Sequence, residues 1–337
     1  RSIMKRIIGI AAAVVSIGIL AGTASAGIVQ RVLVSDRNND RVLEFGLDGS
    51  YVGVFASGYV PGGIAQDSAY NVYIADSSGG GDIKKYQTDG TEFTSAFTNS
   101  NSNITPDDLA FDASGNLYFG NPFGSGDEDD GVYRVDTPSS ATEVLDDSNF
   151  DGPPRGITFD GNGNLLVADR GTVDGQGELE SFDPDSSFSS NAALITDEPN
   201  IEAPIYHDGS VFYTVNVGSD GNDPAYPGSD QILFVVREIN ATTGDIIATY
   251  DPDIDTGALL LDTIIMPDGD LLVSGFVDDA VYRYDATDGW STFASGDFGG
   301  VTMDGPSFMS VIIPEPTTLA LLGLGFASLL GRRRRRA

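Results

Sequence analysis

The sequence predicts an all-β protein built from six four-stranded modules that close into a ring, a β-propeller. Three observations lead to this prediction: a short apolar run ending in aspartate recurs, its copies are about 45 residues apart, and strand-like sequence lies between them. No stretch between the two chain ends carries helical periodicity. Four short strands per repeat at this period are typical of a propeller blade.

The first run of each repeat is expected to form the innermost strand of a blade. Clear copies read GGIAQD, DDLAFD, RGITFD and GGVTMD, and weaker ones read APIYHD and DTIIMPD. In the same order, these copies occupy residues 62–67, 107–112, 155–160, 299–304, 203–208 and 262–268. Six copies predict six blades.

Further strands follow each first run. A second apolar run comes after a turn, for example NVYIAD at 71–76, and a third strand alternates into another turn, for example VYRYDATDG at 281–289. A fourth run is visible as SYVGVF at 50–55, TEFTSAF at 91–97 and DIIATY at 245–250. These runs are rich in Val, Ile, Tyr and Phe and are bounded by Gly, Asp and Asn, as short strands are.

The chain begins in mid-blade, because VLVSD at 32–36 fits a second run. The copy at 299–304 is therefore expected to supply the missing inner strand, so that the two ends close the ring by hydrogen bonding. FMSVII at 308–313 reads as one more second run. It could add a strand there or compete with the N-terminal run, and seven blades is the alternative to six.

Composition limits the chemistry. The chain has no cysteine and one histidine, His207, which excludes disulfides, thiolate metal sites and multi-histidine sites. The 50 acidic residues outnumber the 18 basic ones, and the formal charge is −32. Such a surface repels phosphate backbones, so nucleic acid is not an expected partner, whereas divalent cations are attracted. Aspartate favours turns, so much of this charge is expected in loops.

The N-terminal residues 1–26 are predicted to be a signal peptide that begins natively at Met4. Lys5 and Arg6 form a basic start, 7–21 is apolar, and Ala24-Ser25-Ala26 is a small-residue cleavage site. Cleavage is expected after Ala26. The alternative is an uncleaved N-terminal anchor.

The C-terminal residues 314–337 carry three features in order. Pro314-Glu315-Pro316 precedes an almost wholly apolar stretch at 317–331, and a basic cluster follows, made of Arg332, Arg333, Arg334, Arg335 and Arg336. As a helix, the apolar stretch spans about 22 Å, which is short for a hydrocarbon core of about 30 Å. The arginines are expected to stay on the cytoplasmic side.

This arrangement resembles the PEP-CTERM sorting signal that exosortases process in Gram-negative bacteria. The resemblance implies export, transient anchoring in the inner membrane through a C-terminal helix, and cleavage near Pro-Glu-Pro. It also implies delivery to the cell surface or an exopolysaccharide matrix. The alternative is an ordinary anchor that stays in place. The remaining body, residues 27–313, is expected to be the propeller.

The body resembles NHL repeats and the related six-bladed regucalcin and gluconolactonase-like propellers. VLVSDRNNDRVLEF matches the NHL pattern best, with Asp36, Asn39 and Arg41 at its Asp, Asn and Arg positions. Lactonases of this kind hold a divalent cation at the channel mouth with carboxylates and an asparagine. Their motif places Asp or Asn after Pro at a strand start, which Pro106-Asp107 matches, whereas Pro154-Arg155 places a cation there.

The starts of the inner strands are the default candidates for a site at the channel mouth. They carry polar residues at Asp107, Asp108, Arg155, Glu202 and Asp262, and glycine at Gly62, Gly63, Gly299 and Gly300. An enzymatic interpretation places a divalent ion among Asp107, Glu202 and Asp262. The alternative is that these side chains solvate the mouth.

Two long acidic loops, at 121–130 and 217–230, offer oxygen ligands of the kind that calcium accepts. The candidate ligands are Asp127, Asp129, Asp220, Asn222 and Asp230. Neither loop has the register of an EF-hand. Calcium is therefore a candidate ion, and solvated loops are the alternative.

The sequence contains no coherent catalytic set such as a serine nucleophile elbow, a phosphate loop or a dinucleotide fingerprint. The leading hypothesis is thus an exported binding or structural protein of a surface matrix, with an exosortase and polysaccharide or surface proteins as partners. The alternative is a divalent-metal-dependent, lactonase-like hydrolase or lyase.

Overall fold

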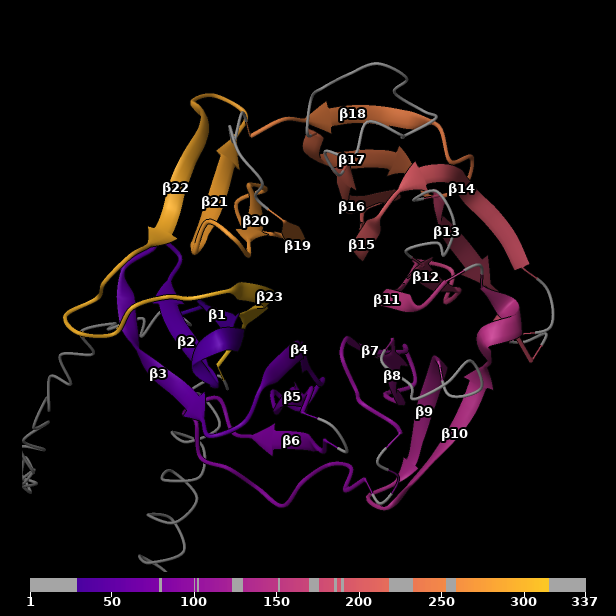
Figure 1. Cartoon of the computed structure of the whole chain (residues 1–337), viewed down its shortest axis with the longest axis horizontal. Helices are drawn as coiled ribbons and strands as arrows, with labels where there is room; N and C mark the ends of the chain where they lie inside the picture. Colours follow the sequence, from indigo (N-terminus) through magenta and orange to yellow (C-terminus); the bar gives the residue numbers. More distant parts are fainter. Residues whose placement is uncertain are drawn as a thin grey trace, which may run out of the picture.

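The computed structural model describes residues 29–78, 81–99, 101, 103–122, 130–150, 152–169, 176–184, 187–188, 191–217, 233–252 and 259–314. In these ranges the chain forms six antiparallel sheets arranged around a central channel (Figure 1). The predicted six-bladed propeller is confirmed, and the seven-bladed alternative is wrong. Each blade starts at the channel and runs outward in chain order, apart from the blade that joins the two ends.

The first three blades contain the strands from the N-terminal half and the last strand of the described chain. Blade 1 is β23 (Pro306–Ile312), β1 (Arg31–Asp36), β2 (Arg41–Gly46) and β3 (Tyr51–Ser57), with the 3₁₀ turn η1 (Arg37–Asn39) between β1 and β2. Blade 2 is β4 (Pro61–Gln66), β5 (Val72–Asp76) and β6 (Ile83–Tyr86). Blade 3 is β7 (Leu109–Phe111), β8 (Leu117–Asn121), β9 (Gly131–Thr137) and β10 (Ser140–Leu145), followed by η2 (Asp147–Asn149).

The remaining three blades follow without interruption. Blade 4 is β11 (Pro154–Phe159), β12 (Leu165–Asp169), β13 (Gln176–Phe182) and β14 (Asn191–Pro199). Blade 5 is β15 (Ile201–His207), β16 (Ser210–Val217), β17 (Leu233–Asn240) and β18 (Ile246–Tyr250). Blade 6 is β19 (Leu260–Ile265), β20 (Leu271–Gly275), β21 (Ala280–Asp285) and β22 (Gly289–Ser295).

The core lies between adjacent blades rather than inside any one of them. The second strands β5, β8, β12 and β20 are buried at every residue, because both of their faces pack on neighbouring sheets. At the junction of blades 2 and 3, for example, Phe97 packs on Phe119, which stacks on Tyr133 with ring centroids 5.3 Å apart. No single blade could bury both of its apolar faces alone, so the ring has to close.

The recurring aspartate that ends the first run has a local structural role. The Oδ1 atom of Asp67 accepts hydrogen bonds from the backbone N–H groups of Ala69 and Asn71, while Oδ2 accepts one from Asn71 Nδ2. Asp112 and Asp160 make the same contacts with residues two and four positions later. An Asp-x-x-x-Asn turn therefore joins the first and second strands of blades 2, 3 and 4.

Ring closure follows the predicted principle but uses a different segment. β1 pairs with β23, from Arg31 opposite Ile312 to Asp36 opposite Pro306. The prediction that 299–304 forms the inner strand is wrong, because Gly299 and Gly300 have φ angles of 75° and 100° that turn the chain. That segment leads instead into β23, which contains most of the FMSVII run.

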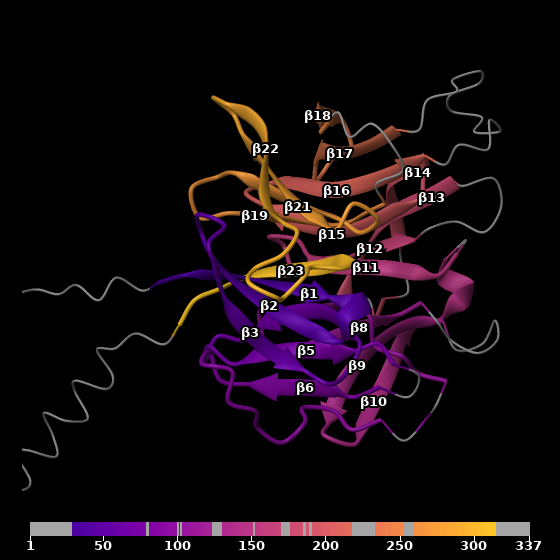
Figure 2. The ribbon, with the colours of Figure 1, turned by 60° about the vertical axis from the view of Figure 1, so that its left-hand side comes forward.

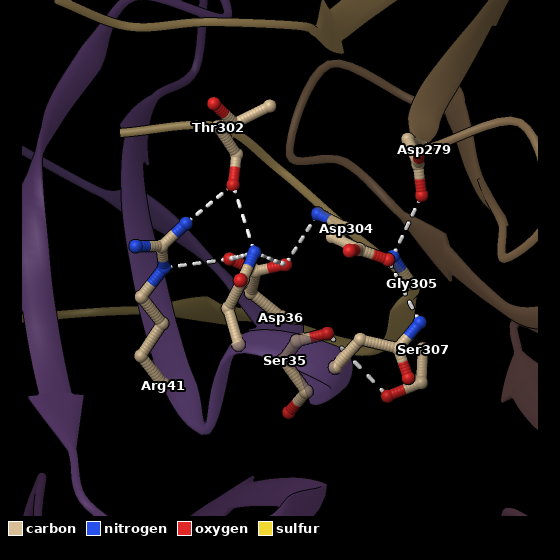
Figure 3. A network of polar contacts seen from close by, with 10 residues as sticks. Ser35, Asp36, Arg41, Asp279, Thr302, Asp304, Gly305 and Ser307 are labelled. Atoms are coloured by element: carbon tan, nitrogen blue, oxygen red, sulfur yellow. Dashed lines mark hydrogen bonds and ion pairs between the residues drawn. The ribbon is translucent and has the colours of Figure 1, made fainter. Parts of the chain in front are cut away.

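Asp36, Asn39 and Arg41, the residues that match the NHL pattern, hold this incoming segment. Figure 3 shows Asp36 and Arg41 beside Thr302 and Asp304. Asp36 is fully buried, and its carboxylate accepts hydrogen bonds from Arg41 Nε at 2.6 Å and from the backbone N–H of Asp304 at 2.6 Å. Asn39 Nδ2 and Arg41 both donate to the carbonyl oxygen of Thr302. We call these three residues the clasp.

Blade 2 differs from the prediction at its outer edge. TEFTSAF at 91–97 forms no strand, only isolated bridges to β6 at Ile83 and Tyr86. The backbone N–H groups of Phe93 and Ala96 donate to the carbonyl oxygens of Lys85 and Ile83, respectively. The two donors are three residues apart in the chain, whereas the two acceptors on β6 are only two residues apart. This mismatch breaks the ladder, as a bulge does.

The two described chain ends leave the ring on the same side (Figure 2). Arg31 and Ile312 are paired at this end of blade 1, whereas Asp36 and Pro306 are paired at the opposite end. The predicted signal and sorting helices, with Ala24, Ala26 and Arg332 to Arg336, lie outside the described residues. No helix in the described ranges is long and apolar enough to cross a membrane.

Candidate functional site at the channel mouth

The starts of the inner strands and the ends of the second strands lie at one end of the ring, as predicted. Pro61 lies opposite Asp76 and Pro154 opposite Asp169 in the strand registers. A channel cavity of about 280 Å³ is lined by residues from the inner-strand region of all six blades, and its acidic lining residues are Asp108 and Asp262. The mouth is therefore the place where the predicted polar residues can meet.

Asp107 is buried and faces blades 1 and 2 rather than open solvent. Its Oδ1 accepts a hydrogen bond from Arg37 Nη1 at 3.0 Å and another from Ser77 Oγ at 2.9 Å. Its backbone carbonyl also accepts a hydrogen bond from the N–H of Gly63. One oxygen of this carboxylate is thus engaged by a guanidinium and a hydroxyl group.

Asp108 and Asp262 occupy equivalent positions in blades 3 and 6 and make equivalent contacts. One oxygen of each accepts the N–H of the following residue at 2.8 Å. The other oxygen reaches the inner strand of the next blade, at the N–H of Ile157 at 2.8 Å for Asp108 and at that of Met309 at 2.6 Å for Asp262. Each carboxylate therefore joins two blades.

Burial dominates the electrostatics of this pair. Removal from water raises the pKa of Asp108 to about 7, and the nearby charge of Asp107 adds to this, despite two backbone donors that lower it. Burial likewise raises the pKa of Asp262 well above its usual value, and the charge of Asp108 raises it further. Like charges in one desolvated channel favour the protonated forms.

The other residues that were predicted to lie at the mouth differ in burial and position. Arg155 is half-buried at the start of β11, and Glu202 is buried on β15 opposite Thr214. Gly62 is required by close packing, since a Cβ there would meet the carbonyl oxygen of Asp107 at 2.6 Å. Gly299 and Gly300 lie in the loop before β23 and do not start an inner strand.

The carboxylates Asp107, Asp108 and Asp262 do not fit a divalent-ion site of the lactonase kind. A metal site needs several oxygens converging on one point. Here the oxygens of Asp108 and Asp262 point at backbone N–H groups of different blades, and Asp107 faces an arginine. Asn121 and Asn216, at second-strand ends, also bind backbone groups of neighbouring segments.

A different acidic group lies on blade 4 and was missed in the sequence. Asp169, Glu178 and Glu180 each offer one oxygen, and these oxygens all lie within 4.8 Å of one another, close enough to hold a metal ion. Asp169 Oδ1 also accepts the N–H of Glu178 at 3.1 Å. The sequence did contain a signal for this group. Glu178 and Glu180 are two residues apart and so lie on the same face of one strand, and Asp169 ends the strand that pairs with it. The loop ligands Asp127, Asp129, Asp220, Asn222 and Asp230 lie outside the described residues.

His207 is exposed at the end of β15, with Nε2 3.7 Å from the carboxylate of Asp208. The strand turns at Asp208 and Gly209 directly afterwards, which carries this residue out of the channel. Trp290 packs beside Tyr284, with ring centroids 5.3 Å apart, at the junction of blades 5 and 6.

Comparisons with known proteins agree with the predicted C-terminal sorting motif and with the propeller fold. Residues 313–336 match the model of the PEP-CTERM protein-sorting motif. A protein of unknown function from Bacteroides caccae has a TM-score of 0.55 and 13% identity, over 84% of this chain and 98% of that one. A gluconolactonase from Xanthomonas campestris has a TM-score of 0.54 and 16% identity, over 73% and 79%.

A further solved structure, a putative gluconolactonase, has a TM-score of 0.51 and 14% identity, over 86% of this chain and 87% of that one. A search of curated proteins found no match. At these identities the structural similarities show the fold alone. The chain is therefore a six-bladed β-propeller with gluconolactonase-like structural neighbours, and it carries at its C-terminus a PEP-CTERM motif, which implies secretion and exosortase processing.

Proposed function

We propose that this protein is an exported, surface- or matrix-sorted propeller that acts as a binding or structural component, in an exopolysaccharide or biofilm context. The observation that carries the proposal is the use of the mouth carboxylates. Asp107, Asp108 and Asp262 are engaged by an arginine and by backbone N–H groups of adjacent blades. Asp107 and Asp262, two residues of the enzymatic interpretation, thus hold adjacent blades together, as Asp108 does.

The proposed processing divides the chain into a signal peptide at 1–26, the propeller at 27–313 and the sorting segment at 314–337. Before cleavage, the sorting segment anchors the protein in the inner membrane of a Gram-negative cell. Because the described C-terminus leaves the ring at the end opposite the mouth, the mouth then faces away from the membrane. Exosortase cleavage near Pro314-Glu315-Pro316 releases the propeller to the surface.

Sorting is tested by mass analysis of the surface-released protein. The proposal expects a form that begins at Gly27 and lacks the five arginines from Arg332 to Arg336. A released or surface form that retains the arginines would contradict processing. The matched variant replaces Pro314 and Pro316 by alanine, and it should accumulate in the inner-membrane fraction while the propeller itself remains folded.

The matrix context is tested by fractionation of intact cultures. The processed propeller is expected to sediment with secreted polysaccharide and to be released when that polysaccharide is degraded enzymatically. A processed protein that remains entirely in the soluble medium, with or without polysaccharide, would contradict a matrix role.

The enzymatic alternative is favoured by one specific observation, the carboxylate group of Asp169, Glu178 and Glu180 beside the mouth. Its test follows the melting temperature of the purified chain with calcium, manganese or zinc, together with hydrolysis of glucono-δ-lactone. The binding proposal expects no lactone turnover above the uncatalysed rate. Turnover that needs a metal and is lost in Asp169→Asn with Glu180→Gln, or in Asp107→Ala with Asp262→Ala, would overturn it.

A further inference from the structure

Lys85 is an unusual cation in this acidic protein. It lies on β6 directly opposite Tyr73 of β5, on the face of blade 2 that packs toward blade 3. Its Nζ is 5.0 Å from the centroid of the Tyr73 ring and 5.8 Å from that of Phe93. Among the described residues, no carboxylate lies within ion-pair distance of this ammonium, although the chain has 50 acidic residues against 18 basic ones.

Cations at the same register position in other blades are neutralised. Arg134 lies opposite Tyr118 in blade 3 and pairs with Asp136 at 2.9 Å. Arg283 lies opposite Leu272 in blade 6 and pairs with Asp270 at 2.5 Å and with Asp268 at 2.7 Å. The neighbouring Lys84, on the opposite face of β6, has Asp82 at 3.8 Å. Lys85 therefore keeps a charge that contacts two aromatic rings but that no carboxylate of the described residues neutralises.

Lys85 lines a groove of about 460 Å³ between blades 2 and 3, within the size range of small-ligand sites. One wall of the groove comes from the 91–97 segment, which makes only isolated bridges to β6, the outermost strand of its blade in Figure 1. Its lining combines the rings of Tyr73 and Phe111 with hydroxyl and amide groups of Thr94, Asn116 and Thr137. Asp136 also lines it but is engaged by Arg134 and Thr142.

We propose that this groove binds a saccharide unit carrying one carboxylate, such as a hexuronate. The ammonium of Lys85 supplies a charge-assisted donor for the carboxylate. The hydroxyl and amide groups suit sugar hydroxyls, and the flanking rings offer apolar surface to the C–H face of a sugar. A single carboxylate suits this site better than a dense polyanion, because the acidic body repels charge that extends far beyond the groove.

The groove shares no lining residue with the channel cavity, so the inference concerns a second place on the molecule. It deepens the proposed binding role and rests on that role only for the source of the ligand. Failure of the groove test would leave sorting and matrix association intact. Failure of matrix association would, in turn, leave the Lys85 contact measurable with a purified sugar.

The chain offers a direct probe, because its three lysines are Lys5, Lys84 and Lys85. Reductive ¹³C-methylation of the purified full chain keeps their charge and gives few lysine methyl resonances, which Lys84→Gln and Lys85→Gln assign by loss of a peak. On titration with digalacturonic acid, the Lys85 resonance should shift and the Lys84 resonance should stay. Calorimetry on the unmodified chain should show affinity reduced about tenfold or more in Lys85→Gln.

Lys84→Gln is the matched control, since it removes the same charge from the adjacent residue on the other face, and it should change affinity by less than about twofold. An unmoved Lys85 resonance, or an equal loss in both variants, would overturn the proposal. Equal affinity for neutral galactobiose would also overturn it, because the groove would then not recognise the carboxylate. Acetate that shifts Lys85 as strongly as the sugar at equal concentration would overturn the saccharide class.

Discussion

The two ends of the inner strands use the same chemical group in opposite ways. At the mouth end, Asp108 and Asp262 accept one N–H from their own strand and one from the next blade. At the turn end, Asp67, Asp112 and Asp160 accept N–H groups only from their own turn, two and four residues later. One set joins blades, and the other shapes hairpins.

Their electrostatics differ because solvent reaches the two ends differently. Burial raises the pKa of Asp108 to about 7, although two backbone donors favour its charged form. For Asp67, burial also acts upward, but the donors Asn71, Tyr73 and Ala69 outweigh it and the pKa falls below its usual value. The two carboxylates accept similar hydrogen bonds, so the degree of desolvation decides whether the pKa rises or falls.

The largest expected effect comes from Asp36, a buried carboxylate at the mouth end whose cation partner is Arg41. Asp36→Ala would leave Arg41 without its carboxylate and would free the N–H of Asp304 at the ring closure. We expect a loss of about 3–5 kcal/mol in the free energy of unfolding, measured by urea denaturation. Asp288→Ala, at an exposed turn, is the control and should change stability by less than about 0.5 kcal/mol. Equal losses in both variants would show that the clasp does not hold the ring.

The second expected effect is a pH dependence carried by Asp108. Its pKa is about 7 when folded and near the usual 3.8 when unfolded, so the unfolded chain ionises first as pH rises. The contribution of protonated Asp108 to the free energy of unfolding is fully present below about pH 4 and is lost between about pH 4 and pH 7. The loss should be about 4 kcal/mol.

Urea unfolding of wild type and Asp108→Asn across this range checks the sign. The variant has no ionisable group at this position, so the stability difference between the two proteins should move in favour of the variant as pH rises. A difference that stays constant from pH 4 to pH 8 would contradict a desolvated carboxyl at the mouth.

A third, smaller effect tests whether the mouth end is held by close contact between blades. A Cβ at Gly63 would meet the Cα of Asp108 at 2.7 Å, whereas a Cβ at Gly53 in the outer strand β3 would meet nothing within 4 Å. Gly63→Ala should therefore cost about 1–3 kcal/mol by overpacking. Gly53→Ala, with the same chemical change, should be within about 0.5 kcal/mol of wild type. Comparable melting temperatures for the two variants would refute the contact.

Much of the fold was predictable because its repeat is local. The Asp-x-x-x-Asn turn fixes where the first strands of blades 2, 3 and 4 end. The second strand β5 is buried on both faces, so its apolar run is continuous. Ring closure was harder to assign. Residues 299–304 resemble a first strand, but two glycines with positive φ turn them, and the run at 308–313 takes the inner place.

The site was less predictable than the fold, because its chemistry depends on which groups other blades supply. The position of Asp107 at the mouth follows from the repeat, but its partner Arg37 comes from 70 residues away. The group of Asp169, Glu178 and Glu180 comes from two paired strands, and no single sequence motif predicts that pairing. Lys85 stands out only when its register is compared with that of Arg134 and Arg283.

The smallest expected effect belongs to the turn end and has the opposite pH sign. Asp67→Ala removes a carboxylate that accepts hydrogen bonds from Ala69, Asn71 and Tyr73, at a cost of about 1 kcal/mol near neutral pH. Because the folded pKa of Asp67 lies below the unfolded value, its contribution is present above pH 3.8 and is lost as pH falls through the folded pKa. The difference in stability between wild type and Asp67→Ala should therefore disappear in acid. At the same low pH, protonated Asp108 makes its largest contribution to stability. A gap that closed on raising the pH instead would show that desolvation, not turn hydrogen bonding, governs both ends of the strand.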